Sequence, residues 1–153
     1  MHQVFVFGTL KEGFPNFKIN KGTRLKGTFV TKNRYPLYLI GERYSPCLVL
    51  DEGSGYNIKG QVFTVDEAAL RDMDKLERIS ESDGYRRVEL TVVSEDSGEE
   101  LVVFAYGKAI EQMDGAQLQS ETIDEYTLEH SSLYRNRNSY LGLVPCSTHI
   151  ESQ

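Results

Sequence analysis

The sequence predicts one α+β domain, in which a mixed β-sheet of about six strands curls into a small barrel flanked by one or two helices. Short runs of β-branched and aromatic residues alternate with glycine and proline turns, which is typical of β-strands. One amphipathic segment near the middle of the chain predicts a helix. The length of 153 residues suits a single hydrophobic core.

The first half of the chain is expected to be mostly strand. Its opening run, Val4–Phe7, is β-branched and aromatic throughout, as in a strand buried on both faces, and it ends at Gly8. Pro36 should keep a later strand near a sheet edge. A glycine turn at 53–55 precedes the clearest alternation of the chain. The further expected strands are Arg24–Thr31, Tyr35–Ile40, Cys47–Leu50 and Ile58–Val65.

The second half begins with the helix. Asp66 is a good N-cap for a helix over 67–76, because its carboxylate can accept hydrogen bonds from the first-turn amides. Two strands, 85–93 and 101–106, should follow, joined by a polar turn. The sequence pattern over residues 108–119 predicts a weak helix. We expect residues 1–119 to form the domain and 120–153 to be its C-terminal strap or a partly disordered tail.

Composition excludes several classes of function. The net charge of −6 and the absence of a clustered basic face argue against nucleic-acid binding. No apolar run approaches the roughly 20 residues that a membrane helix needs, and the N-terminus lacks the basic leader of a signal peptide. Cys47 and Cys146 lie far apart, so free thiols in a reducing compartment are expected. These features predict a cytoplasmic protein that binds neither membranes nor nucleic acid.

A carboxylate stands at the end of the helix stripe that should be buried. Leu70, Met73 and Glu77 are spaced i, i+3 and i+7, so they share one helix face. Burial of an unpaired carboxylate raises its pKa, and such a group can transfer protons near neutral pH. A second interpretation is that the helix ends at Leu76 and Glu77 turns to solvent.

The turn after the first strand is a candidate binding element. Gly8, Thr9 and Leu10 would present several backbone N–H groups at the rim of the sheet. Such an amide nest can hold a carboxylate or an oxyanion, and a glycine allows close approach. An ordinary turn explains the same residues.

Few other residues suggest chemistry. Tyr85 and Arg87 are two apart on one strand, so they share a face, and Tyr106 ends the next strand; each could donate to a ligand or simply pack. The histidines show no metal-ligand spacing, and no serine or cysteine has the context of a nucleophile. Metal-dependent hydrolysis and acyl-enzyme chemistry are therefore poorly supported.

Several motifs together resemble the γ-glutamyl cyclotransferase family, AIG2-like, and most closely its γ-glutamylamine cyclotransferase branch. Phe7-Gly8-Thr9-Leu10 resembles the family's Tyr-Gly-Thr-Leu, and Met73-Asp74-Lys75-Leu76-Glu77 resembles its Leu-Asp-x-Phe-Glu. The branch also has counterparts of the following segments, in the same order: Pro15-Asn16, Tyr35–Leu37, 53–55, Gly60–Glu67, 85–87 and, in the tail, Tyr126, Glu129, His130 and Tyr134.

The resemblance implies a small mixed barrel and an intramolecular reaction. The α-amino group of a γ-glutamyl substrate attacks its own γ-amide carbonyl, which closes 5-oxoproline and releases an amine. Because the nucleophile belongs to the substrate, the resemblance implies no cofactor and no metal. The family's catalytic glutamate falls on Glu77 as general acid and base, and its substrate cradle falls on residues 7–10.

The chain departs from the family pattern in ways that bear on specificity. Phe7 removes a tyrosine hydroxyl from the cradle, the segment 78–84 is long and polar, and Cys47 stands where animal members of the branch carry a bulky aromatic. Two alternative functions remain: a binding module that senses a γ-glutamyl compound, and a cyclotransferase for γ-glutamyl amino acids or glutathione. Retention of Glu77 favours an enzyme over a binding module.

Overall fold

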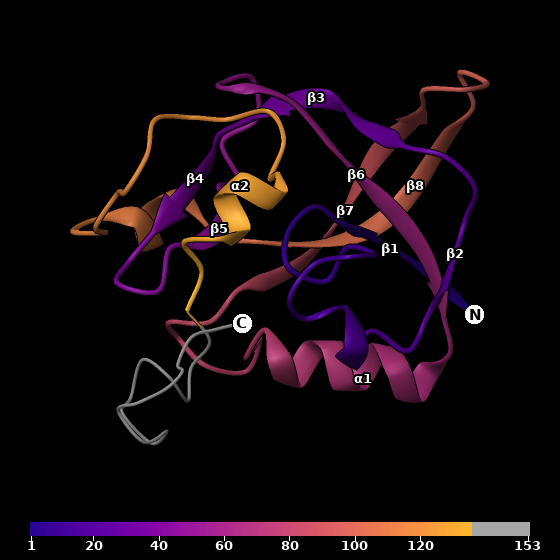
Figure 1. Cartoon of the computed structure of the whole chain (residues 1–153), viewed down its shortest axis with the longest axis horizontal. Helices are drawn as coiled ribbons and strands as arrows, with labels where there is room; N and C mark the ends of the chain where they lie inside the picture. The colour runs from indigo at the N-terminus through magenta and orange to yellow at the C-terminus, as the bar shows by residue number, and fades with distance from the viewer. Residues whose placement is uncertain (136–153) are drawn as a thin grey trace.

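The computed structural model describes residues 1–135, and its centre is a closed five-stranded barrel (Figure 1). The strand order is β1-β8-β7-β3-β6, and pairing of β1 with β6 closes the barrel. β1 pairs with β8 in parallel, whereas β1 with β6, β6 with β3, β3 with β7 and β7 with β8 are antiparallel. The barrel strands are β1 (His2–Val6), β3 (Phe29–Tyr35), β6 (Tyr56–Val65), β7 (Arg86–Ser94) and β8 (Glu100–Gly107). The predicted mixed barrel is confirmed.

The expected strand over 24–31 is wrong, because the chain turns within it. Gly27 has a φ of +92°, in the left-handed region that favours glycine. The residues before it form β2 (Thr23–Arg24), which pairs with the end of β6, and the residues after it begin β3. A proline divides the next expected strand in the same way. Tyr35 ends β3, Pro36 interrupts the strand, and a hairpin follows.

That hairpin stands beside the barrel as a separate two-stranded sheet. β4 (Leu37–Ile40) pairs with β5 (Ser45–Leu48), with Leu37 opposite Leu48 and Ile40 opposite Ser45. Its tip, residues 41–44, contains two residues with positive φ, Gly41 at 71° and Tyr44 at 54°. The hairpin therefore carries residues 41–46 out to one end of the barrel.

The helix forms where its pattern predicts it. α1 runs from Glu67 to Leu76, and Ala69 N donates to Asp66 Oδ1 at 2.7 Å. Its apolar face, which includes Leu70 and Met73, packs against Val4 and Val6 of β1 in one buried cluster. Leu76, the last residue of the helix, is 42% exposed.

β1 is buried on both faces, as its composition predicts. Phe5, with Phe7 just beyond the strand, points into the barrel interior, where it packs with residues of β3, β6, β7 and β8. Val4 and Val6 point the other way, toward α1. The strand that leads into the candidate cradle is therefore held on both faces.

The C-terminal part wraps around the hairpin. Within 108–119 the structure has a short 3₁₀ helix, Ile110–Met113, rather than an α-helix. The chain then runs along β4, where Gln119 N donates to Leu39 O at 2.7 Å and Ile123 N to Leu37 O at 2.9 Å. A buried tyrosine, Tyr126, precedes α2 (Leu128–Ser131).

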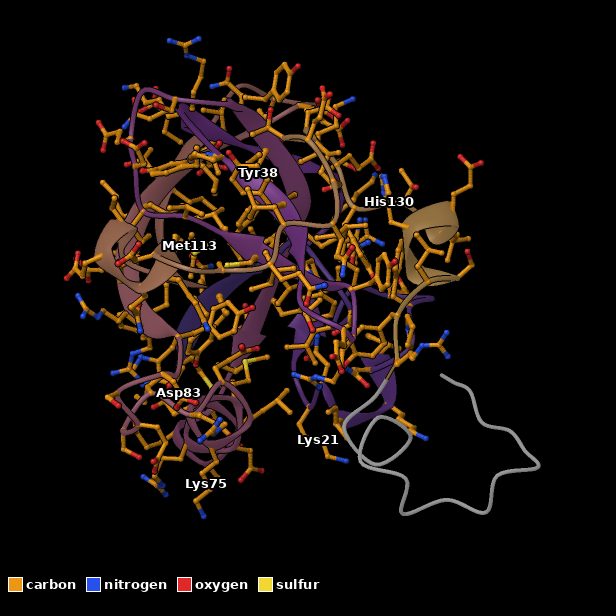
Figure 2. The ribbon with its side chains drawn as sticks, turned by 90° about the vertical axis from the view of Figure 1, so that its left-hand side faces the viewer. Lys21, Tyr38, Lys75, Asp83, Met113 and His130 are labelled. Carbon is orange, nitrogen blue, oxygen red and sulfur yellow. The ribbon has the colours of Figure 1, made fainter. Side chains whose placement is uncertain are left out.

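Residues 120–135 form a packed strap in the structure, and residues 136–153 of the segment expected as a strap or tail lie outside the described part. Lys11 anchors the strap from the N-terminal side, since its Nζ donates to the Tyr126 carbonyl. Met113 and His130 lie on opposite sides of the molecule (Figure 2), so the C-terminal part crosses from one side to the other between them. Among residues 1–135, no helix is long and apolar enough to cross a membrane.

Candidate active site

A cavity of about 690 Å³ lies where β1 ends, and elements from distant parts of the chain line it. Its walls are the turn at 7–10, the end of α1 with the loop 78–84, Tyr85 just before β7, the end of β8 and the tip of the β4–β5 hairpin. Tyr134 of the strap completes the lining. This size is ordinary for a small-molecule site.

The turn at 8–11 lines this cavity through residues 8–10 and contains unpaired backbone amides. Lys11 N donates to Gly8 O at 3.1 Å, which makes Thr9 and Leu10 the central residues of a tight turn. Within residues 1–135, the backbone N–H groups of Gly8, Thr9 and Leu10 donate to no acceptor. Buried amides are normally satisfied, so three open N–H groups in a cavity lining form a ready site for an anion or a carbonyl oxygen.

Asn16 holds this turn in place from the following loop. Its backbone N donates to Thr9 O at 2.8 Å, and its Nδ2 donates to Thr9 Oγ1 at 2.8 Å. The same Nδ2 lies 3.2 Å from the Tyr134 hydroxyl, so the strap also supports the turn. A Cβ at Gly8 would come within 2.7 Å of Pro46 Cγ, which explains why the hairpin can approach here so closely.

Glu77 lies just beyond the last turn of α1, at the C-cap. Its N donates to Met73 O at 2.9 Å, and its carbonyl accepts from Tyr85 N at 2.9 Å, so the backbone on both sides is fixed. The helix does end at Leu76, yet Glu77 lines the cavity instead of leaving it. Its carboxylate is half-buried and has no hydrogen-bond or ion-pair partner within residues 1–135.

Burial raises the pKa of Glu77 from 4.5 to about 7, against the opposing influence of the Arg43 charge. At neutral pH the carboxyl group is then divided between its acid and base forms. A group in that state can both accept and return a proton within one catalytic cycle.

The loop after Glu77 is strained and braced. Arg78 adopts a φ of +57°, and Gly84 packs so closely on the Arg78 carbonyl that no side chain would fit. Gln112, from the 3₁₀ helix, donates to Gly84 O at 2.8 Å and to Ser82 O at 3.1 Å. The long polar segment is therefore an ordered wall of the cavity.

Tyr85 lines the cavity next to Glu77. Its hydroxyl donates to Pro46 O at 3.2 Å, and Lys108 Nζ lies 5.2 Å from the centre of its ring. Cys47 lies behind it, fully buried, and burial raises the pKa of this thiol to about 11. A neutral buried thiol is a poor nucleophile, so Cys47 packs the wall.

Two predicted site residues converge on Asp74, which is not itself among the predicted site residues. The Tyr106 hydroxyl donates to Asp74 Oδ1 at 2.7 Å, and Arg87 Nη1 donates to Asp74 Oδ2 at 2.6 Å. Tyr106 also lines the cavity, whereas Arg87 does not and instead packs over Phe104. Asp74 could have been found from its position in the last turn of the helix, three residues before Glu77.

Three further cavity residues carry weaker signals in the sequence. Asn16 follows a proline in an apparent loop, Arg43 lies in a turn, and Tyr134 belongs to a polar tail. Only the folding of the hairpin and the strap across the barrel end brings them to Glu77. Within residues 1–135 no three histidine, cysteine or acidic side chains gather as a metal site.

Residues 4–121 match the family described as gamma-glutamyl cyclotransferase, AIG2-like. The chain belongs to this family. It is 37% identical over 111 residues to a gamma-glutamylaminecyclotransferase of Bos taurus, an alignment that covers 69% of this chain and 65% of the relative. It is 33% identical to gamma-glutamylaminecyclotransferase B of Danio rerio, over 82% of this chain and 68% of the relative. The chain thus spans a little under two thirds of the first of these relatives.

A solved structure supports the same assignment. The crystal structure of an AIG2-like protein from Mus musculus superimposes with a TM-score of 0.76 at 29% identity, covering 90% of this chain and 97% of that one. The superposition extends beyond the region of the family match. The predicted family and branch are therefore confirmed.

Proposed function

We propose that this protein is a γ-glutamylamine-type cyclotransferase, which converts a γ-glutamyl amide into 5-oxoproline and a free amine. The observation that carries the proposal is the pairing, in one cavity, of a half-buried, unpartnered Glu77 with the three open amides of residues 8–10. The names of its relatives support the same reaction.

The reaction needs little from the protein besides positioning and one proton carrier. The α-amino nitrogen of the substrate forms a bond to the γ-carbonyl carbon, and the bond from that carbon to the leaving nitrogen breaks. One proton moves from the attacking nitrogen to the leaving nitrogen, so atoms balance without water. We assign this transfer to Glu77, because its pKa of about 7 suits both halves of the transfer.

The cradle supplies the positioning. The open N–H groups of Gly8, Thr9 and Leu10 would hold either the substrate α-carboxylate or the oxygen that becomes negative during attack. Folding the flexible glutamyl chain so that its two ends meet lowers the entropic barrier to ring closure. Phe7, without a hydroxyl, can contribute only backbone and packing contacts.

The remaining assignments follow from these roles. Tyr85 would form the cavity wall beside Glu77, and Tyr106 and Arg87 would act indirectly by holding Asp74. The partner is a small γ-glutamyl compound. A reducing, cytoplasmic setting fits the buried free thiol of Cys47.

The direct test is to incubate the purified chain with γ-glutamyl amines and γ-glutamyl amino acids and to measure 5-oxoproline, glutamate and the released amine. Cyclotransfer gives 5-oxoproline and amine in equal amounts, with no oxygen from labelled water in the product. Release of glutamate would identify a hydrolase. Saturable binding of the conjugates without any product would identify a binding module.

A further inference from the structure

One side-chain amide beside the cradle uses both of its hydrogens on hydroxyl oxygens. Asn16 Nδ2 donates to Thr9 Oγ1 at 2.8 Å and to the Tyr134 hydroxyl oxygen at 3.2 Å. These three side chains come from the cradle turn, the loop after it and the strap, and all of them line the cavity. Because an amide NH₂ group has only two hydrogens, Asn16 has none left to donate to a ligand.

Both hydroxyl groups keep a free proton. A hydroxyl has one hydrogen to donate and two sites that accept. Since each oxygen accepts from Asn16, its own hydrogen must turn toward a different acceptor. Within residues 1–135, neither the Thr9 nor the Tyr134 hydroxyl donates to a protein group. Both side chains are half-buried at the cavity, so the two hydroxyls are donors for a ligand.

These hydroxyls add to the open backbone amides of the same turn. The N–H groups of residues 8–10 donate to no acceptor within residues 1–135. Three amides and two hydroxyls therefore border one part of the cavity. A carbonyl oxygen has about two acceptor sites, whereas an ionised carboxylate has about four on its two oxygens. This set of donors fits the α-carboxylate of a γ-glutamyl compound better than a single developing oxyanion.

The strap fixes the position of Tyr134 on both sides along the chain. Before it, Lys11 Nζ donates to the Tyr126 carbonyl, which ties the strap to the end of the cradle turn. After it, Arg135 N donates to Arg43 O at 3.0 Å, which ties the strap to the hairpin tip. A donor held in place by such contacts loses little conformational freedom when a ligand binds.

We propose that Tyr134 is a substrate-binding residue, whose hydroxyl, oriented by Asn16, donates to the α-carboxylate of the γ-glutamyl substrate beside the amides of residues 8–10. This inference rests on the proposed cyclotransferase function. It gives the strap a direct part in binding the glutamyl group, and it makes Asn16 a positioning residue. The α-carboxylate does not change during the reaction, so the contact lowers KM and leaves kcat nearly unaffected.

The test pairs the Tyr134 hydroxyl with the group that it contacts. A γ-glutamyl amide is compared with the same compound carrying an α-carboxamide in place of the α-carboxylate. In Tyr134→Phe, kcat/KM for the carboxylate should fall about tenfold, mainly through a higher KM, because a charge-assisted hydrogen bond is lost. For the carboxamide the loss should be about threefold or less. The inhibition constant of the carboxamide gives the same comparison where its turnover is too slow to measure.

Tyr126→Phe is the matched control from the same strap. Tyr126 is fully buried and does not line the cavity, and its hydroxyl has no partner within residues 1–135. Its removal should leave kcat/KM for both compounds within about twofold of wild type. Melting temperatures check that each variant is folded. Equal loss on both compounds in Tyr134→Phe overturns the inference, as does no loss on either or a selective loss in Tyr126→Phe.

Asn16→Asp tests the orientation of the hydroxyls. A carboxylate only accepts hydrogen bonds, so the Thr9 and Tyr134 hydroxyls would turn their protons toward it and away from the ligand. Adding Tyr134→Phe to Asn16→Asp should then change kcat/KM for the carboxylate by no more than about twofold. A further tenfold loss would show that Tyr134 donates without help from Asn16, and it would overturn the positioning role. Absence of 5-oxoproline with every γ-glutamyl compound in wild type would instead refute the proposed function itself.

Discussion

Two carboxylates three residues apart at the C-terminal end of α1, Asp74 in the helix and Glu77 at its C-cap, have opposite surroundings. Asp74 accepts hydrogen bonds from Tyr106 and Arg87, one on each oxygen. Glu77 has no partner within residues 1–135 and borders the cavity. A carboxylate with both oxygens engaged is a structural tie between helix and sheet. An open, half-buried one keeps its lone pairs for a substrate and is the better candidate base.

The largest expected effect is a difference in activity between variants of Glu77 and of Asp74. Glu77→Gln keeps the size of the side chain but cannot carry a proton, so kcat should fall by about a thousandfold or more. Asp74→Asn should cost about tenfold or less, because it acts on the reaction only through packing. Steady-state release of 5-oxoproline, with circular dichroism to check folding, measures both. Comparable losses in the two variants would show that Asp74 also takes part in the chemistry.

The pH profile sharpens the same comparison. Only the ionised form of Glu77 can act as base, so kcat/KM should rise with pH and level off above an inflection at about 7. The Arg43 charge lowers the pKa of Glu77, so Arg43→Met should move the inflection upward. The profile is measured with one γ-glutamyl amide from about pH 5 to 9. If the inflection in kcat/KM lies at the same pH in Arg43→Met as in wild type, it reports the ionisation of a group other than Glu77.

The free energy of unfolding should change in opposite directions in Glu77→Gln and Asp74→Asn. Burial raises the pKa of folded Glu77 from 4.5 to about 7, so the folded state binds the proton more tightly than the unfolded state does. Its contribution to stability is therefore complete below about 4.5 and is lost as the pH rises through 7. Glu77→Gln escapes this loss, and its advantage over wild type should grow by about 1–2 kcal/mol between acidic and mildly alkaline pH.

Asp74→Asn, in contrast, should lower stability by about 1–3 kcal/mol, because Arg87 and Tyr106 both lose a charged acceptor at a partly exposed site. Urea unfolding at several pH values measures both effects. A Glu77→Gln protein less stable than wild type at alkaline pH would mean that its carboxylate has a stabilising partner.

The smallest effect is expected in the cradle. Phe7 is 8% exposed and packs against Phe5, with ring centres 6.2 Å apart. Phe7→Tyr, which restores the family residue, should be tolerated and change kcat/KM by no more than about threefold, in the direction of improvement if the hydroxyl reaches substrate. The turnover and the melting temperature of Phe7→Tyr are both measured and compared with those of wild type. A large loss of activity in a folded protein would show that the cradle has adapted to the missing hydroxyl.

Local patterns predicted the parts of the fold that depend on neighbours in sequence. The helix and its Asp66 cap were predicted at the observed residues, because capping and the 3.6-residue period act within one turn. The expected strand over 24–31 failed, since alternation continues across Gly27 while the backbone turns there. The weak helix over 108–119 became a single 3₁₀ turn whose Gln112 braces the loop 78–84.

The sequence by itself determined the barrel class, the family, and the two elements from which the candidate site starts, the turn at 7–10 and the end of α1. Tertiary structure alone decided which charges face each other across the cavity. Arg43, Tyr134 and Glu77 are separated by long stretches of chain, and they meet only because the hairpin and strap fold over the barrel end. Burial of Glu77, and with it the raised pKa, results from that assembly, since desolvation depends on everything packed nearby and not on sequence neighbours.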